Sequence, residues 1–348
     1  MPGKALTSKR YQVSDIYEAM ELYHKKGWTD GLPIVPPTEE MVQAFLEAGG
    51  REPSEVLGIE PVRGRVITAE KAAVNTVMAG CKPEYFPVVA AAIEAMCQEP
   101  FNFHAITVST AGAAVMAVVN GPIAKELGMN SGISLFGPGN RPNATIGRAI
   151  RLIITNVTEA APGELDKATF GHPGKFSYCF AEAEEISPWE PMHVERGFPK
   201  ESSTVTVFAA MAPLQVSSHA ANTPEPVLTG IADALKAYGP SQGEVVLVLA
   251  PEHLGHIKAA GWSKSQVKEF LAQKARRTIK DWQDWGRMES GTSRDDLNKL
   301  LSVCKTSNTV TVIVGGGAAG AFSVIISLWG GGTSSRSEIR EIKRPGKK

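Results

Sequence analysis

Apolar residues follow two different spacings along the chain, and their alternation predicts an α/β protein. Short continuous apolar runs, typical of buried strands, occur at 104–109, 114–120, 205–210, 244–249 and 310–314. The run at 310–314 reads as the last strand, 322–329 is a further apolar run after it, and a shorter run at 32–35 reads as an early strand. The segments between them have helical spacing, begin at capping residues or proline, and end at glycine. Strands that alternate with helices indicate the α/β class.

The helix pair around Cys81 shows these signals most clearly. Thr68 can cap a helix over 69–78, and Pro83 suits the first turn of the next helix. Cys81 falls in the joint, where free backbone N–H groups and the neighbouring Lys82 form an environment that lowers the pKa of a thiol. We therefore take Cys81 as a candidate nucleophile or redox thiol. The alternative is a small residue that fills a tight corner between two helices.

A polar, glycine-rich loop at 130–143 runs directly into a helix predicted over 144–156. The first turn of such a helix can present free N–H groups to an anion. Side chains of the loop and helix add donors, and the candidate substrate-binding residues here are Asn140, Arg141, Asn143 and Arg148. The loop matches neither Walker A nor GxGxxG, so no nucleotide or other cofactor is indicated. The alternative is a structural loop whose asparagines satisfy its own turns.

Three short matches recur in the same order and predict two related α/β halves. Gly171–Ser177 resembles Gly317–Ser323, the helix at Pro122 resembles that at Pro251, and the helix at Pro83 resembles one at Pro224. The alternative is one larger mixed domain with chance resemblance. The expected division is a helical N-terminal extension at 1–67, a first α/β half at 68–200, a second half at 201–336 and a charged, exposed tail at 337–348.

The expected duplication places the site in a cleft between the halves, because domain interfaces commonly hold small-molecule pockets. The two glycine-rich loops would supply Gly174, Lys175 and Gly317 to the substrate. Ala321 stands in the second loop where the first has Lys175, so the positive charge is supplied once. Candidate groups for moving protons are the imidazoles of His172 and His219, since imidazole titrates near neutrality.

The acidic stretch from Glu182 to His193 supports a separate hypothesis. Carboxylates near an imidazole can bind a metal or move protons, which would suit a metal-dependent hydrolase. Their spacing matches no specific metal motif, so no metal ligand is assigned, and solvated surface charge is the competing interpretation.

Composition narrows the class of protein and the expected cellular compartment. The chain has 348 residues, 36 basic and 36 acidic side chains, and a net charge of zero, which argues against a nucleic-acid-binding surface. Its four cysteines are widely spaced without CxxC, so neither a disulfide scaffold nor a cysteine zinc site is indicated. No signal peptide or apolar run of membrane-spanning length is present, and a reducing cytoplasm is the expected compartment.

Four segments resemble a poorly characterised bacterial family associated with UGSC-type (seleno)proteins. They are DGLPIVPPTEE (30–40), AVNTVMAGCKPEYFPVV (73–89), NSGISLFGPGNRPNATIGRA (130–149) and SPWEPMHVERGF (187–198). The resemblance implies thiol or selenol chemistry, distantly like glycine-reductase-type systems. This chain has no UGSC segment, so the resemblance implies a separate thiol or selenol redox protein as partner. It also has Ala321 where the family pattern leads us to expect a basic residue.

Together these observations predict a cytoplasmic enzyme that acts on a small anionic molecule through Cys81, as a thiol-dependent oxidoreductase, transferase or hydrolase. The second hypothesis is a non-catalytic ligand-binding subunit of a thiol-dependent reductase system. The third is the metal-dependent hydrolase. Assembly into a homo-oligomer is left open by the sequence.

Overall fold

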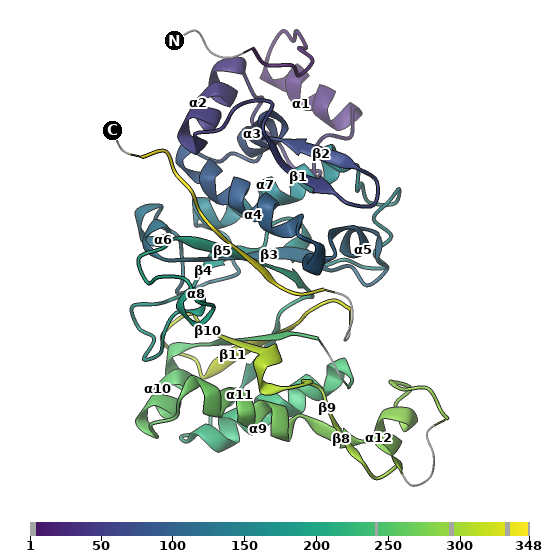
Figure 1. Cartoon of the computed structure of the whole chain (residues 1–348), viewed down its shortest axis with the longest axis vertical. Coiled ribbons are helices and arrows are strands. Elements are labelled where there is room, and N and C mark those ends of the chain that lie inside the picture. The colour runs from purple at the N-terminus through teal and green to yellow at the C-terminus, as the bar shows by residue number, and fades with distance from the viewer. Residues whose placement is uncertain (1–4, 241–242, 292–295, 331–334, 347–348) are drawn as a thin grey trace.

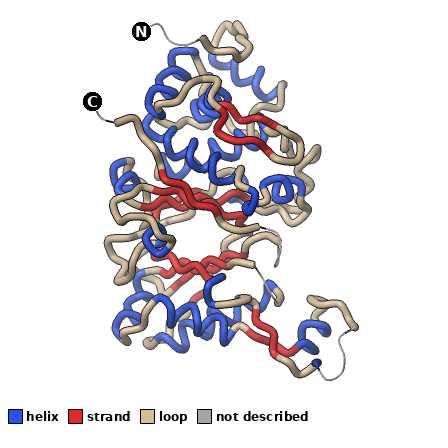
Figure 2. The backbone as a smooth tube through the Cα atoms, viewed as in Figure 1, coloured by secondary structure: helices blue, strands red, loops and turns tan. Residues whose placement is uncertain are grey.

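Two four-stranded mixed sheets face each other, and helices cover the outer side of each sheet. The computed structural model describes residues 5–240, 243–291, 296–330 and 335–346. The layers run helix, sheet, sheet, helix from top to bottom of Figure 1, and Figure 2 shows the two stacked sheets in red. The α/β class predicted from the apolar runs is therefore confirmed.

The first sheet has the order β12-β5-β3-β4 and the second has the order β10-β7-β11-β6. In each sheet one pair is parallel, β3 with β4 and β10 with β7, and all other neighbours are antiparallel. The first sheet comprises β3 (Ala114–Asn120), β4 (Cys179–Ala181), β5 (Thr204–Ala210) and β12 (Glu338–Glu341). The second comprises β6 (Leu214–Ser217), β7 (Val245–Leu249), β10 (Val310–Val314) and β11 (Phe322–Ser327).

The two sheets exchange edge strands. The chain leaves β5 in the first sheet to form β6 at the edge of the second, and leaves β11 in the second to form β12 at the edge of the first. Read from the exchanged strand, the orders are β12-β5-β3-β4 and β6-β11-β7-β10, each with two antiparallel contacts followed by one parallel contact. The connections cross where Ala210 pairs with Leu328. An origin by duplication stays a prediction.

This correspondence agrees with the match between the helices at Pro122 and Pro251 and contradicts the match between the two glycine-rich loops. The helices opened by Pro122 and Pro251 both follow the inner strand of their sheet, β3 and β7. The loop 171–177, however, precedes the edge strand β4, whose counterpart is β10, whereas 317–323 leads into β11, whose counterpart is β5. The two glycine-rich loops are therefore not at equivalent places. The similarity between Gly171–Ser177 and Gly317–Ser323 lies in glycines that suit turns and does not indicate equivalent positions in the two sheets.

The helices form where capping residues and proline predict them. Thr68 Oγ1 accepts a hydrogen bond from Lys71 N at the start of α3, which spans Ala69–Met78 as expected. The other helices over the first sheet are α4 (Phe86–Met96), α5 (Phe103–Val108), α6 (Pro122–Glu126) and α7 (Arg141–Val157), preceded by α1 (Ile16–Lys25) and α2 (Glu39–Gly49). Later come α8 (Met192–Glu195), α9 (Pro224–Leu235), α10 (Pro251–Ala259), α11 (Lys264–Lys274) and α12 (Ile279–Asp284). Two-stranded ribbons are β1 (Val56–Glu60) with β2 (Arg65–Thr68), and β8 (Arg276–Thr278) with β9 (Leu300–Ser302).

The inner strands are buried on both faces, which explains their continuous apolar runs. Along β3, Val115, Ala117 and Val119 pack toward the helices, while Met116 and Val118 face the second sheet. On the opposing sheet, Val246 and Val248 of β7 complete this inter-sheet core. Strands covered on both sides lose the polar alternation of a surface strand.

Three sequence predictions about elements were wrong. Residues 104–108 belong to α5 instead of a strand, and Phe103 and Ile106, three residues apart on one helical face, pack into the core. Residues 32–35 lie outside every strand, although Val35 N donates to Met78 O. The segment expected as an exposed tail at 337–348 contains β12, which hydrogen-bonds along β5. Its charged side chains suit an edge strand, where charge discourages further pairing.

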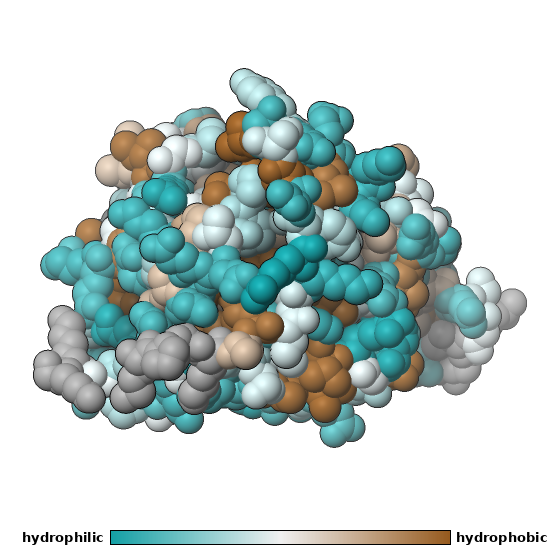
Figure 3. Space-filling view, turned by 90° about the horizontal axis from the view of Figure 1, so that it is seen from above, coloured by the Kyte–Doolittle hydropathy of each residue, from teal (hydrophilic) through white to brown (hydrophobic). Residues whose placement is uncertain are grey.

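The end of the molecule that carries α1 and α2 is mostly hydrophilic, with hydrophobic residues in small separate groups (Figure 3). Among the described helices, none combines the length and the hydropathy needed to cross a bilayer.

Candidate functional site

Most of the predicted site residues lie along α7, at its first turns or against its sides. Asn140 caps this helix by accepting a hydrogen bond from Asn143 N at 3.1 Å, and its own amide donates to Gly128 O at 2.8 Å. Asn143 is buried and exchanges two hydrogen bonds with the backbone of Asn130, at 3.1 and 2.8 Å. Both asparagines thus hold the loop's own backbone, as the structural alternative expected.

The two arginines of this helix bind the protein's own loops. Arg141 donates from Nε and Nη2 to Gly80 O at 3.1 and 2.9 Å. Arg148 makes a two-pronged ion pair with Asp30, with both N–O distances 2.8 Å, and also donates to Pro33 O. Burial acts to raise the pKa of Asp30, but the hydrogen bonds and charge of Arg148, together with backbone hydrogen bonds, outweigh it and hold this pKa below its usual value. The guanidinium of Arg148 is therefore already occupied by an internal carboxylate.

Cys81 lies in the joint between α3 and α4 as predicted, but its environment is apolar. Gly80 ends α3 with φ +86°, the left-handed conformation that suits glycine, and brings Cys81 into the core, where 7 % of its surface is exposed. Burial raises the pKa of its thiol to about 12, although a hydrogen bond with Thr145 and the charges of Arg141 and Arg148 act in the opposite direction. The expected lowering of the Cys81 pKa was wrong, because desolvation of the thiolate outweighs the nearby positive charges.

The two candidate histidines occupy separate surroundings. His172 Nδ1 accepts a hydrogen bond from Gly174 N at 3.2 Å, and its Nε2 lies 3.2 Å from Ala210 O, so the neutral ring with a proton on Nε2 satisfies both contacts. Burial lowers the pKa of His172. His219 lies in the second half, with its ring edge-on to Phe322 at 5.1 Å. The structure does not bring His219 to α7.

Gly317 also lies in the second half, yet it contacts the loop before α7. A Cβ at Gly317 would lie 3.2 Å from Ile133 Cγ1. The loop at 130–143 and the glycine-rich segment after β10 are thus neighbours, and this contact is packing between the halves.

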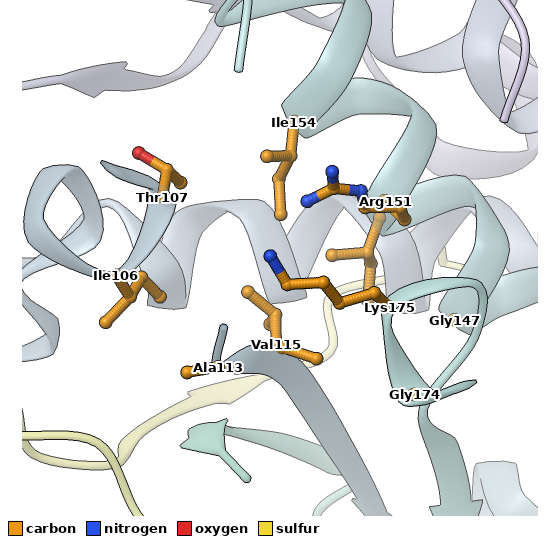
Figure 4. A pocket seen from close by; sticks show the side chains of 11 residues that line it. Ile106, Thr107, Ala113, Val115, Gly147, Arg151, Ile154, Gly174 and Lys175 are labelled. Atoms are coloured by element: carbon orange, nitrogen blue, oxygen red, sulfur yellow. The ribbon is translucent and has the colours of Figure 1, made fainter. Parts of the chain in front are cut away.

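Gly174 and Lys175 line a small pocket together with Arg151, which was not among the predicted site residues. Its walls come from α5, the start of β3, α7 and the 3₁₀ turn Pro173–Lys175. Figure 4 shows the ammonium of Lys175 in the middle of the pocket, with the guanidinium of Arg151 beside it and the side chain of Thr107 at the far wall. The volume, about 20 Å³, is room for roughly one water molecule.

Asp166 balances only one of the two positive charges. Lys175 Nζ lies 2.8 and 2.6 Å from its two carboxylate oxygens, and Arg151 Nη2 lies 3.0 Å from Oδ2. Burial would raise the pKa of Asp166, but the hydrogen bonds from Lys175 and Ala168 N outweigh it and hold this pKa below its usual value. Burial lowers the pKa of Lys175, the ion pair opposes that change, and Arg151 adds to it. The pocket is therefore electropositive and incompletely neutralised.

Gly147 of α7 explains how this loop comes so close to the helix. A Cβ there would overlap Ser177 Oγ and lie 2.6 Å from Tyr178 N. Arg151 lies three residues after Arg148, a spacing that places both on neighbouring turns and that sequence reasoning could have used. Asp166 lies in an irregular loop, and no periodicity or motif indicates it.

A larger cavity of about 610 Å³ is bounded by residues of both halves, from the turn Glu99–Phe101, the start of β7 and the segment before β10. None of the predicted site residues lines it. The predicted cleft with those residues in its walls stays a prediction. Within the described part of the chain, no group of three or more His, Cys, Asp or Glu side chains is arranged to hold a metal ion.

Comparisons with protein-family models, curated proteins and solved structures gave no match, so the interpretation of this site rests on its geometry.

Proposed function

We propose that this chain binds a small organic anion through Lys175 and Arg151, as the ligand-binding member of a thiol-dependent system. The observation that carries the proposal is the pairing of two cationic side chains with a single carboxylate, Asp166, around one pocket. The side chains of Lys175 and Arg151 are only 13 % and 14 % exposed, so their charges are weakly screened by water. The setting would be a reducing cytoplasm and the partner a separate thiol or selenol protein.

The remaining donors suit a carboxylate or a similar flat oxyanion. The ammonium of Lys175 has three N–H groups and the guanidinium of Arg151 has five, more than Asp166 engages. Arginine's planar fork matches a carboxylate, and hydrogen bonds between ions are the stronger class. A volume of about 20 Å³ is room for roughly one water-sized atom, so an anion would enter by one oxygen and the rest of the molecule would project out of the pocket. A binding role needs no titrating base, which agrees with a His172 ring held neutral by the backbone.

The test is calorimetric titration of the whole protein with acetate and with longer monocarboxylates, at low ionic strength. Binding that weakens at least tenfold in Lys175→Met supports the proposal, since a hydrogen bond to a charged group contributes about 1.5–3 kcal/mol. Lys167→Met is the matched control, because Lys167 belongs to the same loop but its Nζ donates to Gly163 O at the surface. Equal affinities in both variants, or no binding to the folded wild-type protein, would refute the proposal.

A thiol enzyme remains the second candidate, because two positive groups, Arg141 and Arg148, act on the otherwise apolar site of Cys81. Arg141 and Arg148 both act to lower the pKa of its thiol, and Thr145 hydrogen-bonds to it. Expulsion of a proton on substrate binding would be needed before this thiol could attack, since the thiolate is the nucleophile. The reactivity of Cys81 relative to the other cysteines distinguishes this candidate from simple anion binding.

A further inference from the structure

Glu182, at the end of β4, is a buried carboxyl group whose two oxygens have different surroundings. Its Oε2 accepts two hydrogen bonds, from Asn120 Nδ2 at 2.6 Å and from Met192 N at 2.8 Å. Its Oε1 is buried and has no hydrogen-bond partner among the described residues. An ionised carboxylate has two equivalent oxygens and needs donors on both, whereas a neutral acid has one carbonyl oxygen and one O–H.

The side chain of Asn120 also has a buried oxygen without a hydrogen-bond partner among the described residues. Its Nδ2 donates to Glu182 and, at 2.9 Å, to Glu184 Oε1, but its buried Oδ1 accepts nothing from the described residues. Turning the amide over would direct its oxygen at two carboxyl groups, so the assigned orientation is the favourable one. Thr204 lies opposite Asn120 on β5, and its buried hydroxyl also lacks a partner, so it does not supply the missing donor.

We infer that Glu182 carries a proton on Oε1 in the folded protein at neutral pH and donates it to Asn120 Oδ1. One proton then satisfies both unpaired acceptors and completes a two-way acid–amide pair, closed on its other side by the hydrogen bond between Nδ2 and Oε2. Leaving both atoms unpaired would cost free energy twice, because buried polar groups without partners lose their hydration.

The charged groups around Glu182 determine how firmly this proton is held. Burial raises the pKa of Glu182 and the charge of Glu184 adds to this, while Lys264 and the hydrogen bonds from Met192 and Asn120 act against it. Lys264, at the start of α11, already donates to Glu190 O and to Glu195 Oε2. The titratable groups that surround Glu182 from neighbouring segments are Glu184, His193, Glu195, Arg196 and Lys264.

This proton links pH to the junction between the halves. The acid–amide pair joins β3 to β4, and Met192 N attaches the start of α8 to the same carboxyl group. Raising the pH would ionise Glu182 and so place a negative charge in this junction, near Lys264 of the second half. A carboxyl group whose folded pKa exceeds its unfolded value of about 4.3 stabilises the fold fully below that value, and loses this contribution as the pH rises toward the folded pKa.

The test compares wild type with Glu182→Gln in denaturant unfolding across pH. Glutamine has an NH₂ group where the neutral acid has its O–H, so the variant should fold and match or exceed the wild type in stability at pH 7. The ratio of unfolding equilibrium constants, wild type over variant, should rise by up to tenfold per pH unit above about pH 4.3. A variant that is less stable than wild type, with a ratio that does not rise, would refute the inference.

Glu184→Gln is the matched control, because it removes a neighbouring carboxylate that accepts from both Asn120 Nδ2 and Gly121 N. No comparable rise in the ratio is expected for it, and an equal rise in both variants would contradict a specific role of Glu182. If Glu182→Gln does not fold, ¹³C-labelled glutamate in the wild-type protein decides by NMR. One side-chain carboxyl resonance in the neutral-acid position at pH 7 supports the inference, and its absence overturns it.

Discussion

The two halves share a strand order but bury different side chains. The first half encloses ionic groups: Asp166 with Lys175 and Arg151, and Arg148 with Asp30 of the N-terminal extension. A buried polar pair of the second half is His253 with Ser323, whose Nδ1 and Oγ are 2.8 Å apart, and burial lowers the pKa of that histidine. Ion pairs such as Lys280 with Asp284 lie at its surface. The two halves therefore combine a shared strand order with different buried polar groups, so the candidate chemistry follows from side chains and not from the fold.

The largest expected difference between the halves concerns a buried ion pair. Arg148→Ala should lower the free energy of unfolding by about 3–5 kcal/mol, because it leaves Asp30, whose side chain is 7 % exposed, as an unpaired buried charge. Denaturant unfolding measures this. Lys280→Ala in the second half removes an exposed pair and should cost less than about 1 kcal/mol. Similar losses would mean that charge burial does not distinguish the halves.

A smaller difference should separate the serines of the two glycine-rich loops. Ser323→Ala leaves His253 Nδ1 buried without its partner and should cost about 1–3 kcal/mol. Ser177 Oγ donates to Ala144 O at 2.8 Å in a half-buried position, where water can replace it, so Ser177→Ala should cost about 0.5–1.5 kcal/mol. Thermal or denaturant unfolding of both variants compares them. Equal losses would show that the two loops are more alike than their positions suggest, and a larger loss in Ser177→Ala would contradict the prediction.

The smallest expected difference is between the buried thiols of the two halves. Burial raises the pKa of Cys304, as of Cys81, to about 12, but among the described residues no charged group opposes this rise at Cys304. We expect iodoacetamide at pH 7 to modify both slowly in the folded protein, and the half-buried Cys97 before either. Mass mapping after timed quenching measures the order. Early modification of Cys81, absent in Cys81→Ser and slowed by acetate, would favour the thiol enzyme over the binding protein.

The sequence was a good guide to elements whose signals are local. Thr68 and Gly80 bound α3 because caps act within one turn, and the apolar run of β3 follows from burial on both faces. The strand character of Glu338–Glu341 could not be predicted, since its charged pattern describes an edge whose partner, β5, lies more than a hundred residues earlier.

Of the candidate site, the sequence allowed prediction of the cationic hydrogen-bond donors but not of their carboxylate partners. Lys175 and Gly174 were identified from their loop, and Arg151 could have been added from its spacing to Arg148. Partner assignments were not accessible, because Asp30 and Asp166 approach α7 through tertiary folding alone. The pKa of Cys81 was predicted with the wrong sign for the same reason. The prediction relied on its sequence neighbour Lys82, whereas its neighbours in space are the apolar core.

The exchange of edge strands constrains the order in which a nascent chain can fold. Residues up to 210 supply three strands of the first sheet, but the outer edge of β5 stays open until residues 338–341 have left the ribosome. During that interval β5 is an edge that another chain could pair with, which exposes the growing polypeptide to aggregation. Because the strand that protects β5 is made last, the first sheet is completed only after the second has been synthesised. Slow translation after residue 210 would lengthen this vulnerable period.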